Sequence, residues 1–259
     1  MIIFFRLAGK VAIVTGGSSG IGETTARLFA QNGAFVVIAD VQDELGLKVV
    51  ESIGLEKASY QHCDLRDEKQ VEEMVAYTLQ KYGSLDILFS NAGIMGDPKG
   101  ILELDMEAFD NVMAVNVRGA AHTMKHAARV MVEKNIRGSI ICTASVASSL
   151  GGCGGIAYTA SKHGLVGLVK SVCCELGAHG IRVNSISPFG VATPLICQPE
   201  NAGQMEEAIS AVSNLKGEVL KTRHIAETAL FLASDESAYI SGQNLAVDGG
   251  FSVVRPVYK

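Results

Sequence analysis

The sequence has few charged residues, few prolines and no long apolar segment. Only 19% of its 259 residues are Asp, Glu, Lys or Arg, against 48% hydrophobic residues, and the net charge is −5. An acidic chain does not neutralise a phosphate backbone or anionic lipid headgroups, so we expect neither nucleic acid nor a membrane as partner. The apolar start, residues 1–5, ends at Arg6 and is too short for a signal peptide or a membrane span, which predicts a cytoplasmic protein.

The six cysteines show neither CxxC pairs nor zinc-ligand spacing. Several lie in apolar runs such as Ile140–Cys142 and Val172–Cys174, which favours reduced, mostly buried thiols over disulfides. His122 and His126 are four residues apart and fit one helix face, but no third ligand accompanies them. We therefore predict no metal site.

No low-complexity linker, repeat or abrupt change of composition divides the chain. Apolar runs rich in branched residues alternate with stretches of helical period, a pattern typical of a parallel sheet covered on both faces. We therefore predict an α/β protein with a single-domain Rossmann fold over residues 1–259, in which helices flank a doubly wound parallel sheet. The candidate strands are Val11–Thr15, Phe35–Ala39, Ala58–His62, Leu85–Ser90, Ser139–Thr143, Val183–Ile186 and Asn244–Val247.

The clearest local motif joins the first strand to a glycine-rich turn and a helix. Gly16, Gly20 and Gly22 follow a GxxxGxG pattern, with Ser19 and Ile21 between them. Glycines let the backbone approach a pyrophosphate closely, and the N–H groups at the helix start can bind the anion. An ordinary tight turn is the alternative, but the strand before it and the helix after it favour a dinucleotide site.

Asp40 closes the second strand, 18 residues after Gly22, where the dinucleotide-binding fold presents a carboxylate to a ribose. A 2′-phosphate at this place would meet a like charge, and neither Gly17 nor Val41 offers a compensating arginine. The position therefore predicts NAD rather than NADP. An acidic residue that merely ends a strand is the other interpretation.

Further motifs, in this order along the chain, make the sequence resemble the short-chain dehydrogenase/reductase family. They are the GxxxGxG turn, Asp64, Asn91-Ala92-Gly93, Asn116, Ser145, Tyr158-Thr159-Ala160-Ser161-Lys162 and the segment from Pro188 onwards. Residues 158–163 and 187–195 are most similar to plant alcohol dehydrogenases related to secoisolariciresinol dehydrogenase. The resemblance spans nearly the whole chain and implies interconversion of a secondary alcohol and its ketone with a nicotinamide cofactor.

Four residues are predicted to be catalytic: Asn116, Ser145, Tyr158 and Lys162. Tyr158 and Lys162 are four residues apart and share a helix face. A phenol titrates at about 10, so Tyr158 needs a nearby cation to exchange protons near neutrality. Ser145 follows an apolar strand and is suited to hold the substrate oxygen. The resemblance gives Asn116 a water that links Lys162 to solvent. Each residue taken singly also fits a solvated helix position or a helix cap.

The resemblance also implies more cofactor contacts. Asp64 and Leu65 would contact the adenine ring, and residues 91–93 would border its ribose. Val191 and Thr193 would hold the nicotinamide carboxamide. The predicted cofactor set is Gly16, Ser19, Gly20, Ile21, Gly22, Asp40, Val41, Asp64, Leu65, Asn91, Ala92, Gly93, Tyr158, Lys162, Pro188, Val191 and Thr193.

Phe189 departs from the pattern of many relatives, which have glycine directly after this proline. We expect its ring either to form an aromatic wall beside the nicotinamide or to pack into the core. The variable segments 94–96, 146–156 and 195–220 are mostly apolar near the expected chemistry, and 195–220 is expected to form a substrate loop. The predicted substrate pocket comprises Met95, Val146, Ile156, Phe189, Gly190 and Leu195.

These features predict NAD-dependent oxidation of a hydrophobic cyclic secondary alcohol, a monoterpenol such as borneol first and a lignan diol second. The competing enzyme is an NADPH-dependent ketone or acyl-carrier reductase, which Asp40 opposes. The alternative that is not an enzyme is an NAD-binding scaffold protein. The resembling family usually forms tetramers through two long helices, here Met106–Glu133 and Ala157–Leu176, so we expect a homotetramer. The apolar positions 165, 168 and 169 fit either that interface or the side facing the sheet.

Overall fold

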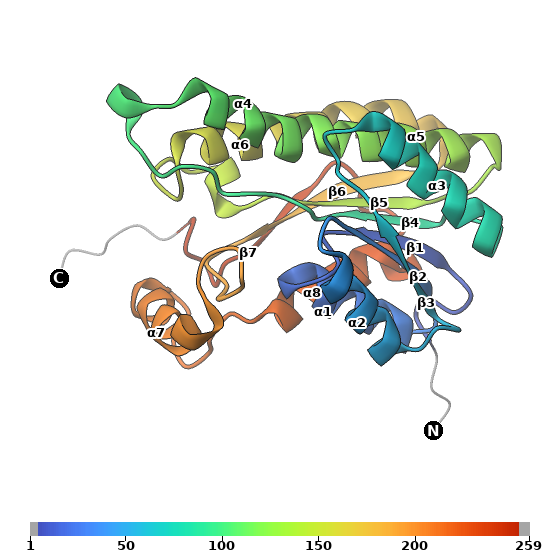
Figure 1. Ribbon diagram of the computed structural model, residues 1–259, viewed down its shortest axis with the longest axis horizontal. Coiled ribbons are helices and arrows are strands. Elements are labelled where there is room, and N and C mark those ends of the chain that lie inside the picture. The colour runs from blue at the N-terminus through green and yellow to red at the C-terminus, as the bar shows by residue number, and fades with distance from the viewer. Residues whose placement is uncertain (1–4, 254–259) are drawn as a thin grey trace.

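Seven parallel strands form one sheet in the computed structural model, which describes residues 5–253 (Figure 1). The strand order is β3-β2-β1-β4-β5-β6-β7. The strands are β1 Val11–Thr15, β2 Phe35–Asp40, β3 Ala58–His62, β4 Ile87–Ser90, β5 Ser139–Thr143, β6 Arg182–Pro188 and β7 Asn244–Val247. The order reverses between β1 and β4, and open α/β sheets bind ligands beside such a switch point. Most of the apolar start of the chain, and residues 254–259 of the predicted domain, lie outside the described residues.

Helices cover both faces of the sheet. In Figure 1, α3, α4, α5 and α6 form the layer above the sheet, α1, α2 and α8 form the layer below it, and α7 lies apart beside β7. Their bounds are α1 Gly20–Gln31, α2 Asp43–Ile53, α3 Glu68–Tyr82, α4 Met106–Met113, α5 Ala120–Glu133, α6 Ile156–Leu176, α7 Ala202–Val212 and α8 Thr222–Ala233. The predicted doubly wound Rossmann fold is confirmed.

The central strands bury both of their faces in two separate apolar cores. Ile13 of β1 and Ile140 of β5 belong to the core under α3, α5 and α6. Val14 of β1 and Ile141 of β5 belong to the core over α1, α2 and α8. Successive side chains of a strand point to opposite faces, so a strand buried on both sides is apolar at nearly every position. This explains the continuous apolar runs in the sequence.

The element bounds differ from the prediction in a few places. β4 begins at Ile87 instead of Leu85, and β6 is longer than expected at both ends. The long helix predicted over Met106–Glu133 is α4 and α5 joined by a π-helical turn, η2, at Ala114–Gly119. Such turns are frequent at functional sites, and this one contains Asn116. The predicted substrate loop 195–220 contains a regular helix, α7.

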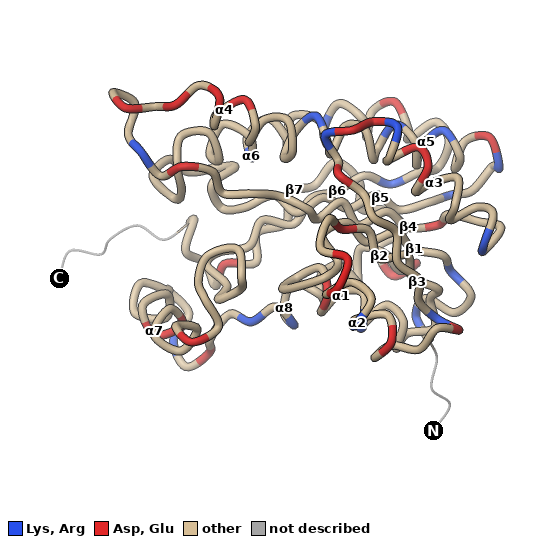
Figure 2. The backbone as a smooth tube through the Cα atoms, in the orientation of Figure 1, with Lys and Arg blue, Asp and Glu red and all other residues tan. Residues whose placement is uncertain are grey.

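Fewer thiols are buried than predicted, and the basic residues are dispersed over the molecule. All six cysteines are free, as predicted, but only Cys63 and Cys142 are buried and Cys174 is exposed. Figure 2 shows Lys and Arg dispersed over the outer helices and loops, not gathered on one element. Within residues 5–253, no helix has both the length and the apolar composition needed to cross a membrane.

Candidate active site

A cavity of about 990 Å³ opens at the carboxyl ends of the strands. It is lined by residues at the ends of β1 and β2 on one side of the switch point, and by residues at or after the ends of β4, β5 and β6 on the other. Every predicted catalytic, cofactor and substrate residue lines it except Gly22, Asn116 and Ile156. The fold therefore brings together segments that the sequence spreads from residue 16 to residue 195.

The glycine turn forms a close backbone cradle at the start of α1. Gly16 and Gly20 have positive φ angles of 63° and 56°, a conformation that favours glycine. A Cβ at Gly22 would lie 2.0 Å from the carbonyl oxygen of Gly16, so only glycine fits there. Gly22 is buried and does not line the cavity, and its cofactor contact stays a prediction. Within the described residues, the Ser19 side chain accepts no hydrogen bond from the first turn of α1. The N–H groups of this turn are thus suited to a pyrophosphate.

The Asp40 carboxylate is held firmly at the end of β2. Its two oxygens accept hydrogen bonds from the Ser18 N–H at 3.0 Å and the Gln42 N–H at 3.1 Å. The Tyr60 hydroxyl donates to the Asp40 carbonyl at 2.6 Å. Asp40 is only 6% exposed but lines the cavity, so it presents a fixed negative charge to whatever binds beside the glycine turn.

The sequence did not predict the arginine that reaches the cavity beside Asp64. The Arg66 guanidinium donates to both oxygens of Asp64, at 3.0 and 2.6 Å, and to Asn111 of α4 at 3.0 Å. The hydrogen bonds from Arg66 hold the pKa of the Asp64 carboxyl below its ordinary value. Arg66 is therefore already paired and is not directed at Asp40. No pattern in the sequence indicated this pairing.

Asn91 ties together three strands under the cavity. Its side-chain amide donates to the carbonyl oxygen of Thr15 at 3.1 Å, and its oxygen accepts from the Thr143 hydroxyl at 3.0 Å. The Asn91 N–H also donates to the Thr15 hydroxyl at 3.0 Å. These bonds join the carboxyl ends of β1, β4 and β5, so Asn91 positions the cavity floor and also borders the predicted adenosine site.

Tyr158, Lys162 and Ser145 meet at one wall of the cavity. Tyr158 and Lys162 lie on α6, and the Lys162 Nζ atom lies 5.4 Å from the centre of the Tyr158 ring. Lys162 is 3% exposed, and its ammonium group donates to the carbonyl oxygen of Thr143 at 2.7 Å. Ser145 follows β5 and caps the short η3 turn, Val146–Ser148. The predicted catalytic side chains are therefore brought together by α6 and the end of β5.

Burial controls the proton affinities of this group. Burial raises the pKa of Tyr158 above its ordinary value, while the neighbouring Ser145 hydroxyl acts in the opposite direction. Burial also lowers the pKa of Lys162 to about 8. The expected depression of the Tyr158 pKa is thus not present in the protein alone, because the loss of hydration outweighs the hydrogen bond with the Ser145 hydroxyl.

Asn116 lies behind the cavity and is 1% exposed. Its amide oxygen accepts from the Ile94 N–H at 2.9 Å, and its NH₂ group donates to the Ile94 carbonyl at 2.9 Å and to the Ser161 hydroxyl at 3.0 Å. The side chain thus holds the segment after β4 against α6. The water that the resemblance assigns to Asn116 stays a prediction, and the side-chain NH₂ group already has two acceptors.

Of the residues predicted to form the substrate pocket, Ile156 alone does not line the cavity. Ile156 begins α6 and is two residues before Tyr158, about 200° around the helix, so it faces away from the cavity. Phe189 lines the cavity and its ring stacks on Phe251, at a distance of 4.0 Å between centroids. Further apolar lining residues that the sequence did not single out are Val115, Cys153, Ile209, Val212 and Phe251.

His122 and His126 lie on α5 and both approach Glu68. The Nε2 atom of His126 is 3.1 Å from a Glu68 oxygen, and that of His122 is 3.9 Å away. Lys125 lies 2.5 Å from the same carboxylate, and its hydrogen bond and that of His126 lower the pKa of Glu68 to about 2. Among residues 5–253, no three His, Cys, Asp or Glu side chains are grouped so as to bind a metal ion.

Comparison with known proteins identifies the family. Residues 16–252 match the family model described as enoyl-(acyl carrier protein) reductase. The chain is 60% identical to short-chain dehydrogenase reductase 3a of Arabidopsis thaliana, over 97% of this chain and 98% of the relative. It is 51% identical to secoisolariciresinol dehydrogenase of Forsythia intermedia, over 98% of this chain and 93% of the relative. The crystal structure of levodione reductase superposes with a TM-score of 0.88 at 32% identity, covering 96% of this chain and 100% of that structure. The chain therefore belongs to the short-chain dehydrogenase/reductase family of oxidoreductases.

Proposed function

We propose that this protein oxidises a hydrophobic cyclic secondary alcohol to its ketone with NAD, and that a monoterpenol such as borneol is the substrate. The observation that carries this proposal is the position of Tyr158, Lys162 and Ser145 in the same cavity as the glycine turn and Asp40. One end of this cavity suits a dinucleotide, and the other combines a proton acceptor with an apolar wall.

The residues of this site divide the chemistry between them. The glycine turn and Asp40 would hold a nicotinamide cofactor, which would supply the acceptor for the hydride of the carbinol carbon. The Ser145 hydroxyl donates a hydrogen bond to the substrate oxygen and orients it towards Tyr158. The Tyr158 phenolate takes the hydroxyl proton as the ketone forms. The Lys162 ammonium group stabilises that phenolate, and its hydrogen bond to Thr143 keeps it at the floor of the site.

Asp40 is the reason to propose NAD as the cofactor. A 2′-phosphate beside this carboxylate would place like charges together, and the nearby Arg66 is already paired with Asp64. We expect Asp40→Asn to shift the ratio of NAD to NADP efficiency towards NADP by at least about tenfold, because it removes the repulsion. Steady-state kinetics with both cofactors measures this ratio.

Asp43→Asn is the matched control for that measurement. Asp43 carries a negative charge close to Asp40, but its oxygen is bound by Tyr60 and His62 and it does not line the cavity. Its substitution should change the cofactor ratio less than about threefold. A wild-type protein that prefers NADPH would contradict the assignment of Asp40.

The substrate class is proposed from the apolar lining of the cavity. Met95, Val146, Leu195 and Phe189 line the same cavity as Tyr158, and none of them can pair with a carboxylate or a phosphate. An uncharged hydrophobic alcohol is thus the ligand that this lining favours. A lignan diol is the second candidate, supported by the 51% identity to secoisolariciresinol dehydrogenase.

Reduction of NAD⁺, followed at 340 nm, tests the proposal with a panel of cyclic terpenols, lignan diols, steroids and short alcohols. We expect turnover with the cyclic terpenols, and its loss in Tyr158→Phe. Turnover of lignan diols alone would replace borneol with the second candidate. NADPH-dependent reduction of ketones or acyl carriers would favour the competing reductase. Cofactor binding without turnover across the panel would favour the non-catalytic scaffold.

The predicted homotetramer and cytoplasmic location are also proposals. Leu165 and Val169 face the sheet and are buried, whereas Leu168 and Val172 line an apolar groove between α5 and α6. This groove supports an interface formed by the two long helices. Mass photometry of the purified chain tests it, and a monomer at working concentration would contradict it.

A further inference from the structure

Two phenylalanines stack at the end of the cavity nearest to α7. Phe189 directly follows β6, and Phe251 lies four residues beyond β7. Their ring centroids are 4.0 Å apart and the ring planes are inclined by 23°. Pro188 and Val247 are paired in the sheet, and the Phe189 N–H donates to the Val247 carbonyl at 3.2 Å. Both rings thus extend from the carboxyl ends of two neighbouring strands and line one cavity.

A turn built around Asp248 holds Phe251 in place. The Asp248 carboxylate is 7% exposed and accepts hydrogen bonds from the N–H groups of Gly250 and Ser252, both at 2.9 Å. Burial opposes ionisation of this carboxyl, but the hydrogen bonds from Ser252 and Gly250 outweigh it and hold its pKa below the ordinary value. Gly249 and Gly250 both have positive φ angles. The position of the Phe251 ring is therefore set by the turn itself.

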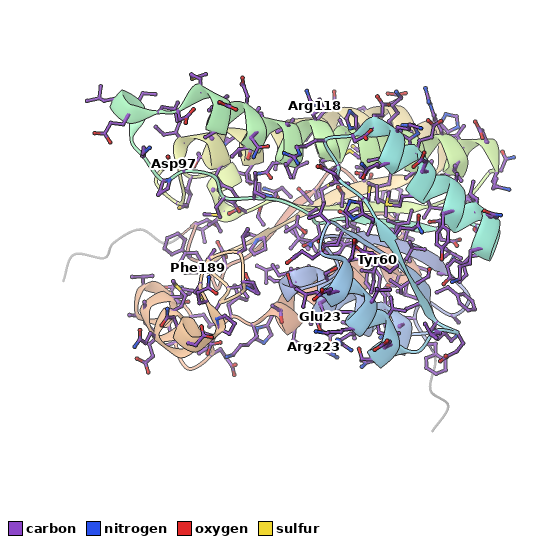
Figure 3. All side chains as sticks on the ribbon, in the orientation of Figure 1. Glu23, Tyr60, Asp97, Arg118, Phe189 and Arg223 are labelled. Carbon is purple, nitrogen blue, oxygen red and sulfur yellow. The ribbon has the colours of Figure 1, made fainter. Side chains whose placement is uncertain are left out.

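The same turn contacts the substrate segment around α7. The Asn214 side chain donates to the Gly249 carbonyl at 3.2 Å, and a Cβ at Gly249 would lie 2.9 Å from the Leu215 Cβ. Ile209 of α7 packs against Gly190, where a Cβ would lie 2.9 Å from the Ile209 Cγ1. Figure 3 shows Phe189 on the α7 side of the molecule. The aromatic pair and α7 thus form one continuous apolar wall.

The opposite end of the cavity suits the cofactor. Asp40 and the glycine turn line that end, and Tyr60, which donates to the Asp40 carbonyl, is well separated from Phe189 in Figure 3. The space between Tyr158 and the aromatic pair is therefore left for the substrate. The aromatic rings themselves offer a rigid apolar surface that loses little conformational freedom when a ligand covers it.

We propose that the stacked pair Phe189 and Phe251 is the specificity-determining wall of the substrate site, and that it selects rigid apolar ring skeletons over acyclic alcohols. A rigid ring has few internal bond rotations to lose when it covers such a surface, whereas a flexible chain must be ordered first. This inference rests on the alcohol oxidation proposed above, and it adds the turn around Asp248 to the substrate site.

Kinetics of Phe251→Ala test the inference. We expect kcat/KM for borneol to fall about tenfold or more, mainly through KM, and kcat/KM for 2-butanol to change less than about threefold. Affinity for NADH should stay the same. Phe251→Leu keeps an apolar side chain, so its kcat/KM for borneol should lie between those of the wild-type protein and Phe251→Ala. Val253→Ala is the matched control, because Val253 is near Phe251 but 80% exposed. An unchanged ratio of borneol to 2-butanol efficiency in Phe251→Ala would overturn the inference.

A second readout does not depend on turnover. The chain contains no tryptophan, so Phe251→Trp introduces a single fluorescent reporter into the wall. With NADH present, borneol should change the tryptophan emission of Phe251→Trp and leave that of Val253→Trp unchanged. If the wild-type protein oxidises no alcohol, the proposed function fails. The change in tryptophan emission still shows whether borneol binds against the wall formed by Phe189 and Phe251. No response of Phe251→Trp to borneol would count against it.

Discussion

Replacing Lys162 by methionine is expected to reduce alcohol oxidation by about 10²- to 10⁴-fold and, at the same time, to stabilise the fold at neutral pH. Lys162 is buried, and burial lowers its pKa to about 8. Below that pH the folded protein carries a charge that has lost its hydration, and methionine removes this cost while it fills a similar volume. Calorimetry at pH 7 should show a Tm higher by about 2–4 °C, which corresponds to roughly 1 kcal/mol for a chain of this size.

The pH dependence of this stability difference has a defined sign. An unfolded lysine keeps its proton up to a pH of about 10.5, whereas the folded Lys162 loses it from about 8. Between these values the unfolded state binds more protons, so the free energy of unfolding of the wild-type protein rises with pH. The advantage of Lys162→Met should therefore shrink from pH 8 to pH 10. A lower Tm for Lys162→Met at pH 7 would show that the bond to Thr143 outweighs the cost of burial.

Tyr158→Phe separates catalysis from these effects on stability. It removes the phenol oxygen and leaves Lys162 in place, so we expect lost turnover with NADH affinity retained. In Lys162→Met, burial still raises the Tyr158 pKa and no ammonium group opposes it in the catalytic complex. The residual activity of Lys162→Met should therefore rise towards higher pH than that of the wild-type protein. Identical pH profiles would contradict the role given to Lys162.

Gly22→Ala is expected to abolish cofactor binding and destabilise the fold. The new Cβ would lie 2.0 Å from the Gly16 carbonyl oxygen and 2.8 Å from the Asn91 amide nitrogen. The Gly16 N–H donates to the Ala39 carbonyl of β2 at 2.8 Å, so the turn cannot move without breaking this hydrogen bond between the ends of β1 and β2. We expect a loss of about 1–3 kcal/mol in the free energy of unfolding and a weakening of NADH binding by at least about 100-fold.

Gly177→Ala is the matched control for Gly22→Ala. A Cβ at Gly177 would meet nothing within 4 Å, and its φ of −56° suits alanine. Its Tm and its NADH affinity should match those of the wild-type protein. Isothermal titration with NADH and thermal unfolding measure both quantities. Tight NADH binding by Gly22→Ala would show that the glycine turn is not the pyrophosphate cradle.

Local patterns were sufficient for the strands and for the placement of Tyr158 and Lys162 on one helix. The strand at residues 11–15 and the helix that contains Tyr158 and Lys162 lie where predicted, because buried strands need continuous apolar residues and an interval of four residues defines one helix face. The same rule explains why Ile156 does not line the cavity. It ends the apolar segment 146–156, but a separation of two residues from Tyr158 places it on the other side of α6.

The sequence by itself determined the doubly wound fold, the glycine turn, the carboxylate after β2 and the Tyr158 and Lys162 pair. Each depends on neighbours along the chain, and backbone geometry acts over such short intervals. Only the tertiary structure decided that Arg66 reaches Asn111 of α4, that burial raises the pKa of Tyr158, and that Phe251 stacks on Phe189. These depend on hydration and on contacts across the sheet, where Pro188 and Val247 become neighbours although 59 residues separate them.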